Sequence, residues 1–123
     1  MQDGYPLRTQ EPEEIVIPVR LLGAGAAAPT KVRGAGITVG RTGVGVYTLT
    51  WSELPGGYAG FSQGFDANTP LNVAGCTCAI TTTTTTSLVW TITVYSGGTT
   101  PAARELAANE WLNLDLKFKR SGV

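Results

Sequence analysis

The stretch "GRTGVGVYTLTW", residues 40–51, decides between a phosphate-binding loop and a β-strand. A phosphate loop aims backbone N–H groups from a glycine turn at the anion and then opens a helix. Here the residues after the glycines alternate, with Tyr47, Leu49 and Trp51 on one face and β-branched residues on the other. No Gly-Lys-Ser/Thr motif follows. We therefore expect a glycine turn that leads into a strand, and no phosphate site.

Length and charge favour one small domain without affinity for polyanions. The 123 residues suit a single core, and nine basic residues balance nine acidic ones. Nucleic acid and anionic membranes are therefore not expected partners. Charged residues make up only 15% of the chain, below the roughly 25% of an ordinary domain. A small neutral surface of this kind is typical of a subunit covered by other chains.

Nothing in the sequence has the character of a membrane anchor. No stretch approaches the roughly 18 apolar residues of a membrane span, and the opening "MQDGYPLRTQEPEE" lacks the basic start and apolar core of a signal peptide. We expect the chain to be made and kept in the cytoplasm of the cell that produces it.

Both cysteines lie in "GCTCAI", as Cys76 and Cys78. Residues two apart in a strand share a face, but a disulfide between them would be strained. A zinc site would need two further ligands, and the chain has no histidine and no other cysteine. We expect reduced, partly buried thiols, no metal and no cofactor.

Residues 1–14 have the composition of an extended arm, since Pro6 and Pro12 disfavour helix and acidic residues predominate. The arm contains one apolar group, Tyr5, Pro6 and Leu7. Two interpretations remain open: this group docks on a neighbouring subunit, or the terminus is frayed.

Residues 15–123 are predicted to form a single antiparallel β-sandwich, jelly-roll-like or immunoglobulin-like. Pro18 makes the first strand, 15–22, an edge strand or a bulged one, because proline cannot donate a ladder hydrogen bond. The clearest alternation occurs over 88–94 and 112–118. Between them, Ala102 to Asn109 is predicted as a short helix of about two turns. Further strands are expected over 31–41, 44–51 and 71–80, and the six threonines 81–86 are expected at a strand end or loop tip.

Residues 52–70 are predicted to be the longest irregular segment, with at most a short strand at 58–61. Glu53 and Asp66 flank its aromatic residues. Carboxylates beside aromatic rings are the equipment of a carbohydrate site, but the same rings also serve to close the end of a sandwich or to meet a partner. The aromatic residues concerned are Trp51, Tyr58, Phe61 and Phe65.

The absence of histidine excludes Ser–His and Cys–His nucleophile systems. A carboxylate pair, as in glycosidases, needs two acids that face each other at about 5–9.5 Å. Most acidic residues lie in the arm or at polar positions of regular patterns. We therefore expect a protein that is not an enzyme.

Three stretches together resemble a group of small virion structural proteins of tailed bacteriophages. They are "QDGYPLRTQEPEEIVIPVRLLGAG", "PTKVRGAGITVGRTGVGVYTLTW" and "ARELAANEWLNLDLKFKRSGV". The most specific element runs from Gly36 to Tyr47, and the threonine tract in the middle has no counterpart. The resemblance implies a β-sandwich subunit on the outer surface of a capsid, a decoration or cement protein that binds the major capsid protein, as a homotrimer.

On that interpretation the arm makes the partner contacts. The apolar and basic residues 5–8 are expected to lie against the shell. The acidic residues between 11 and 14 are expected to meet basic capsid surface. The alternative is a receptor- or glycan-binding module of a head or tail fibre, in which residues 51–65 would bind. The predicted partner-binding residues are Tyr5, Pro6, Leu7, Arg8, Glu11, Glu13 and Glu14.

Overall fold

The protein is an antiparallel β-sandwich, as the alternation predicts. The computed structural model describes residues 14–81 and 85–119, and within them two sheets of four strands face each other. The elements are β1 (Glu14–Leu22), β2 (Thr30–Arg33), β3 (Ile37–Gly43), β4 (Val46–Trp51), β5 (Gly57–Ala67), the 3₁₀ turn η1 (Pro70–Val73), β6 (Thr77–Ile80), β7 (Val89–Tyr95) and β8 (Glu110–Lys119).

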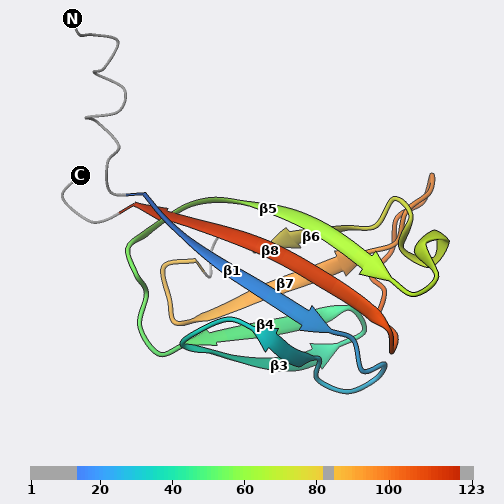
Figure 1. The fold of residues 1–123 in the computed structure, drawn as a ribbon, viewed down its shortest axis with the longest axis horizontal. Helices are drawn as coiled ribbons and strands as arrows, with labels where there is room; N and C mark the ends of the chain where they lie inside the picture. Colours follow the sequence, from blue (N-terminus) through green and yellow to red (C-terminus); the bar gives the residue numbers. More distant parts are fainter. Residues whose placement is uncertain (1–13, 82–84, 120–123) are drawn as a thin grey trace, which may run out of the picture.

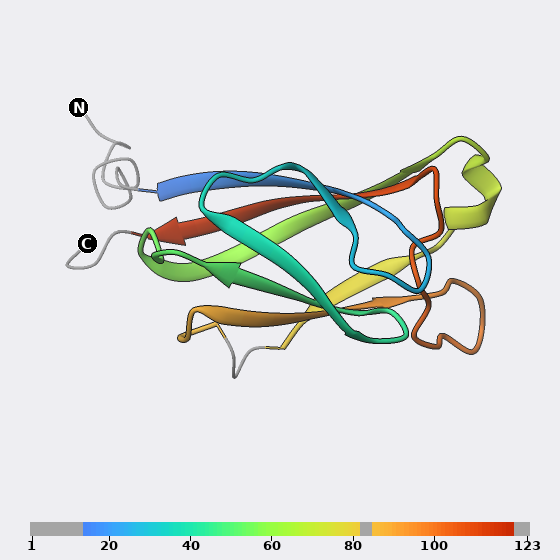
Figure 2. The ribbon, with the colours of Figure 1, turned by 90° about the horizontal axis from the view of Figure 1, so that it is seen from below.

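The first and last strands lie side by side in the middle of one sheet. This sheet has the order β2-β1-β8-β5 and is called sheet A below; the other, sheet B, has the order β3-β4-β7-β6. Figure 2 shows β1, β8 and β5 in one layer and β7 and β6 in the other. Because Glu14 pairs with Lys119, β1 begins and β8 ends at the same end of the sandwich (Figure 1).

The core is built from every second residue of the strands. Tyr47, Leu49 and Trp51 of β4 are at most 3% exposed, and so is every inward residue of β8. The rings of Trp51 and Trp90 lie 5.1 Å apart, and those of Trp51 and Phe118 lie 5.3 Å apart in an edge-on arrangement. Aromatic pairs in this geometry add to the burial of their area. The aromatic cluster therefore joins the two sheets at the end where β1 begins.

The turn between β3 and β4 leads into a strand, and Gly45 is the glycine on which it depends. Gly45 has φ +69°, in the left-handed region, and a Cβ there would lie 2.5 Å from the carbonyl oxygen of Arg104. Only glycine permits that approach of two backbones. The carbonyl of Gly45 also accepts a hydrogen bond from the backbone N–H of Val94 at 2.8 Å.

Pro18 lies where β1 has a neighbour on one side only. β8 pairs along the whole of β1, but β2 pairs only with Arg20 to Leu22, with a register shift between Arg20 and Leu21. The strand is thus an edge strand around Pro18 and bulged further on, which is how a sheet accommodates a proline.

The prediction of an irregular segment over 52–70 was wrong, because Gly57–Ala67 forms the 11-residue strand β5. Its glycines interrupt the apolar alternation on which strand prediction depends. The register of β5 also shifts between Tyr58 and Gly60. Because of this shift, Tyr58 and Phe61 both lie opposite inward residues of β8, although they are three residues apart in sequence. Such a bulge inserts one extra residue and conceals the period of two.

The helix predicted over 102–109 is also absent: these residues are extended or in turns. Their backbone groups bond to other parts of the chain instead: the Arg104 N–H donates to Val94 of β7, and Leu106 accepts from the N–H of Gly25 in the connection between β1 and β2. Leu106 is fully buried, so the segment covers the core at the end of the sandwich where β1 ends and β8 begins. A helix of two turns is marginal without packing, and the tertiary contacts favour the extended form. The short helical turn that does occur, η1, lies in a region predicted as strand.

Gln63 of β5 links the exposed edges of the two sheets. Its side-chain Nε2 donates to the carbonyl of Cys78 at 3.0 Å, and its Oε1 accepts from the Cys78 N–H at 2.5 Å. β6 is an edge strand, so these backbone groups have no neighbouring strand. The amide of Gln63 takes the place of that strand and closes this side of the sandwich.

We predict that Gln63→Leu lowers the free energy of unfolding by about 1–3 kcal/mol, the cost of leaving buried polar groups unpaired. Urea titration followed by tryptophan fluorescence measures the change. The matched control is Ser62→Ala, on the outer face of the same strand, which should change the free energy of unfolding by less than about 0.5 kcal/mol. Equal stability of the two variants would show that the bridge is not needed.

Candidate functional site

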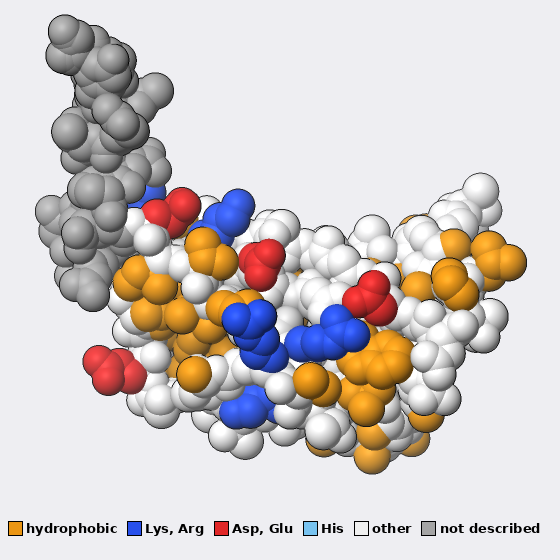
Figure 3. All heavy atoms as spheres, viewed as in Figure 1, with side chains coloured by type: hydrophobic (Ala, Val, Ile, Leu, Met, Phe, Trp, Pro, Cys, Tyr) orange, Lys and Arg blue, Asp and Glu red, His pale blue; other side chains and the backbone are white. Residues whose placement is uncertain are grey.

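The strands of sheet A carry most of the basic side chains of the described residues. The described residues include seven Lys and Arg side chains, and five of them belong to β1, β2 and β8. Figure 3 shows the outer face of this sheet, with basic side chains across its middle. The five are Arg20, Lys31, Arg33, Lys117 and Lys119.

A network on this face fixes Arg20. Its guanidinium donates to Asp66 at 3.0 Å and to Asn113 at 2.7 Å, and it lies over the ring of Trp111 at 5.3 Å. Asn113 also donates to Asp66. Hydrogen bonds from Asn113 and Arg20 lower the pKa of Asp66 below its ordinary value. Exposed pairs of this kind contribute little to stability, but here they hold one arginine in place.

The outer face of sheet B has the opposite character. Its four strands contain one charged residue, Arg41, and seven threonines that point outward. Thr38 lies opposite Thr50, and Thr48 lies opposite Thr91. Depletion of charge distinguishes the centre of a protein–protein interface from ordinary surface. The seven, which we call the threonine face, are Thr38, Thr42, Thr48, Thr50, Thr77, Thr91 and Thr93.

Most of the predicted partner-binding residues lie outside the described residues. These are Tyr5, Pro6, Leu7, Arg8, Glu11 and Glu13. Glu14 is the first residue of β1, where it is exposed and lies opposite Lys119.

The structure does not assemble the aromatic carbohydrate platform that the sequence offered. Trp51 is buried, and Tyr58 packs edge-on against Trp90 at 5.1 Å. Phe61 and Phe65 also pack against the core. Glu53 shares the lining of an open pocket with Ile17, whereas Asp66 pairs with Trp111 at the level of Leu22. Five residues of β1, or about 16 Å at about 3.3 Å per residue, separate these two levels. The rings belong to the core, and these two acids are too far apart to act together.

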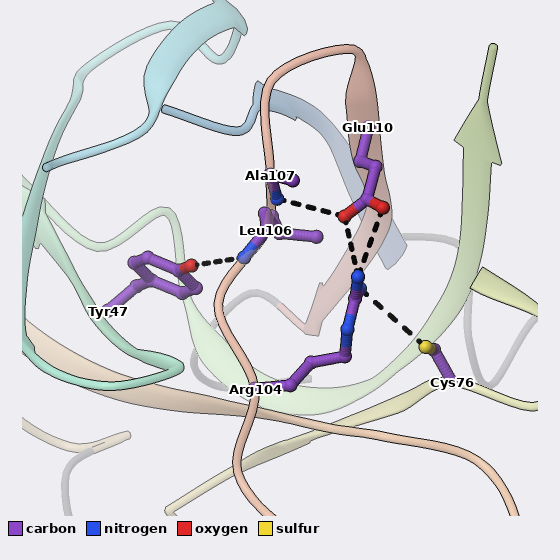
Figure 4. Close-up of polar contacts among 6 residues, drawn as sticks. All are labelled: Tyr47, Cys76, Arg104, Leu106, Ala107 and Glu110. Atoms are coloured by element: carbon purple, nitrogen blue, oxygen red, sulfur yellow. Dashed lines mark hydrogen bonds and ion pairs between the residues drawn. The ribbon is translucent and has the colours of Figure 1, made fainter. Parts of the chain in front are cut away.

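A buried ion pair anchors the segment that closes one end of the sandwich (Figure 4). Arg104 Nη2 donates to both carboxylate oxygens of Glu110, at 2.9 and 3.0 Å. The Glu110 side chain is 4% exposed, and it also accepts from the Ala107 N–H. Tyr47 accepts from the Leu106 N–H at 2.8 Å. Because these charges are paired and bonded, their arrangement is structural.

A second pair holds the same segment to β3. Arg41 donates to Glu105 at 2.7 Å, and the Gly45 N–H donates to the same carboxylate. The hydrogen bond from Arg41 lowers the pKa of Glu105. Because the folded pKa is depressed, this contribution to stability is present above the ordinary pKa of a glutamate and is lost as the pH falls through the lower folded value.

The cysteines are free thiols, with Cys78 buried and Cys76 partly so. Burial raises the pKa of Cys78 to about 12, which keeps the thiol protonated and unreactive at neutral pH. Cys76 accepts a weak hydrogen bond from Arg104 at 3.8 Å. Over residues 14–81 and 85–119 no group of His, Cys, Asp or Glu is arranged to hold a metal ion.

An open pocket that the sequence did not indicate lies beside the unpaired part of β1. It has a volume of about 330 Å³, and its lining includes Ile17, Gly36, Trp51, Glu53 and Pro55. The indole nitrogen of Trp51 is buried and has no hydrogen-bond partner among the described residues. Such a donor is costly to leave unpaired. No sequence pattern indicates this pocket, because its lining comes from three separate segments.

The chain matches no family model, no curated protein and no solved structure closely enough to indicate a relationship. Within the described residues, no helix has the length and apolar character to span a membrane.

We predict that Glu110→Gln lowers the free energy of unfolding by roughly 2–4 kcal/mol, because Arg104 then keeps a partly buried charge without its partner. The control is Asp66→Asn, which removes the exposed partner of Arg20 and should cost less than about 1 kcal/mol. Chemical denaturation at pH 7 compares the two variants. If they lose equal stability, the buried pair is not the anchor of this segment.

Proposed function

We propose that this chain is a structural subunit of a tailed-bacteriophage virion, which attaches as a homotrimer to the outside of the head and binds the major capsid protein. The observation that carries the proposal is the difference between the two outer faces. The four strands of sheet B contain one charged residue, Arg41, and this lies opposite the inward Tyr47, so the outer face of this sheet is depleted of charge, as the centre of a protein–protein interface is.

The resemblance to phage virion proteins adds a second line of support. Its most specific element, Gly36 to Tyr47, contains β3 and the turn into β4, at one side of the threonine face. The residues that carry the resemblance thus include part of the surface that we assign to the partner.

The charges of the body also fit a binding protein better than a catalyst. Arg41, Arg104, Glu105 and Glu110 form ion pairs that hold a closing segment. We propose that attachment is noncovalent and that the arm, with Tyr5 to Arg8 and the acidic cluster up to Glu14, adds contacts on the shell. Repeated weak contacts around a trimer combine into firm attachment.

We predict that purified particles contain the chain in hundreds of copies, because a decoration protein occupies repeated positions on the shell. Quantitative gel staining against the major capsid protein measures the ratio. A dozen copies or fewer would instead assign it to a fibre or tail part, and its absence from mature particles would refute a virion role.

We predict that Thr50→Lys lowers the affinity for capsids stripped of this protein by at least about tenfold, because a buried, unpaired charge is costly in an interface. Thr50 is exposed on β4, so the variant should remain folded. The matched control is Ser62→Lys on the outer face of sheet A, which should bind as the unmodified chain does. Sedimentation of the chain with capsids measures both. Loss of binding in the control alone would assign attachment to sheet A.

A further inference from the structure

The core of the sandwich is incompletely covered along one part of β1. The inward residues Val19 and Leu21 are 1% and 0% exposed. Ile15 and Ile17 have the same orientation but are only partly buried. The difference arises where β2 stops, since β2 pairs only with Arg20 to Leu22.

The pocket described above occupies this uncovered position. At about 330 Å³ it is within the range of pockets that take small ligands or side chains. Its lining combines apolar groups, including Ile17 and Pro55, with one acidic residue, Glu53. Trp51 also lines it, and the buried indole N–H of this residue has no acceptor among the described residues. The complementary ligand is therefore an apolar group accompanied by a carbonyl or hydroxyl oxygen and a cation.

We propose that the Tyr5–Arg8 segment of the chain's own arm occupies this pocket in the isolated protein. Tyr5 and Leu7 supply apolar side chains, the backbone supplies carbonyl oxygens, and Arg8 supplies a cation for Glu53. This segment holds the only group of large apolar residues in the first 14.

The length of the connection fits an attachment within one molecule. Ile17, in the pocket wall, is three residues from Glu14, or about 10 Å along the strand. Residues 9–13 supply five residues, enough for the short connections that join antiparallel neighbours. Tethering also gives the segment an effective concentration in the millimolar range, which favours its own pocket over that of a second copy.

Charge complementarity supports the same assignment. Residues 1–13 contain three acidic side chains and one basic one, whereas the described residues contain six acidic and seven basic. Arg8 is thus the one basic side chain that the arm can offer to Glu53. The acidic residues of the arm would then lie near the basic face of sheet A.

Docking on its own body would keep the arm's apolar group out of solvent until a partner displaces it. The inference concerns the isolated chain and holds whether or not the chain belongs to a virion. Its failure would leave the proposed attachment through the threonine face untouched.

The test uses the indole N–H signals of the three tryptophans in the full chain, recorded by ¹H–¹⁵N NMR. If the segment docks, the double variant Tyr5→Ala/Leu7→Ala shifts the Trp51 signal and makes its N–H exchange with solvent about tenfold faster, as expected for the loss of one hydrogen bond. The Trp90 N–H, which donates to Ser87 at 2.9 Å, is an internal reference and should not change. Unchanged Trp51 exchange would overturn the proposal.

A charge exchange identifies the pairing. Arg8→Glu should release the segment and reproduce the exchange rate of the double variant, and adding Glu53→Arg should restore protection. Asp115→Arg in place of Glu53→Arg is the matched control, because Asp115 is exposed on the outer face of β8, outside this pocket. Equal restoration by both changes, or by neither, contradicts a specific contact with Glu53. Protection of Trp51 that rises with protein concentration would assign the pocket to a second copy and overturn docking within one chain.

Discussion

A sandwich of two short sheets must close its own edges and ends, and this constraint governs most of what is specific to the molecule. Alternate residues of facing strands fill the middle, but they leave the core open wherever a strand stops. Gln63 closes the side between β5 and β6 with a pair of hydrogen bonds to Cys78. Leu106 covers one end, held by Tyr47 and by the pair of Arg104 and Glu110. Along the first part of β1 the described residues provide no equivalent cover.

The need to close the ends of the sandwich also accounts for where part of the charge lies. The pairs that include Arg41 and Arg104 secure the closing segment, and the other basic residues of the described part of the chain belong to strands of sheet A. This leaves sheet B with an outer face of threonine, valine, glycine, alanine and one tyrosine, Tyr95. Arg41, the one charged residue of its strands, lies opposite the inward Tyr47 and pairs with Glu105. A balanced net charge in the sequence therefore conceals two unlike surfaces. The proposed attachment to a capsid uses the neutral one, where binding requires little removal of water from ions.

The threonine face and the pocket beside β1 have different proposed roles: the first binds the capsid, and the second binds the chain's own arm. The threonine face is rigid, because it is formed by the backs of strands whose other side is the aromatic core. The pocket beside β1 is formed by three segments and is matched to one short stretch of the arm. A rigid face and a tethered segment are complementary means of attachment, because the first fixes orientation and the second adds affinity through connection.

The sequence alone determined the class of fold, because the period of two in β4, β7 and β8 is a local property of an amphipathic strand. It also determined that Cys76 and Cys78 are too close in sequence to form an unstrained bridge. Only the tertiary structure decided that residues 57–67 form the strand β5, because glycines and a bulge hide the period of two there. It also decided the extended path of residues 102–109, because contacts with Val94 and Tyr47 outweigh a weak helical preference. It likewise decided that Trp51 and Tyr58 belong to the core and that a pocket opens beside Ile17. These features depend on which strands become neighbours, and pairing between residues distant in sequence leaves no local signature.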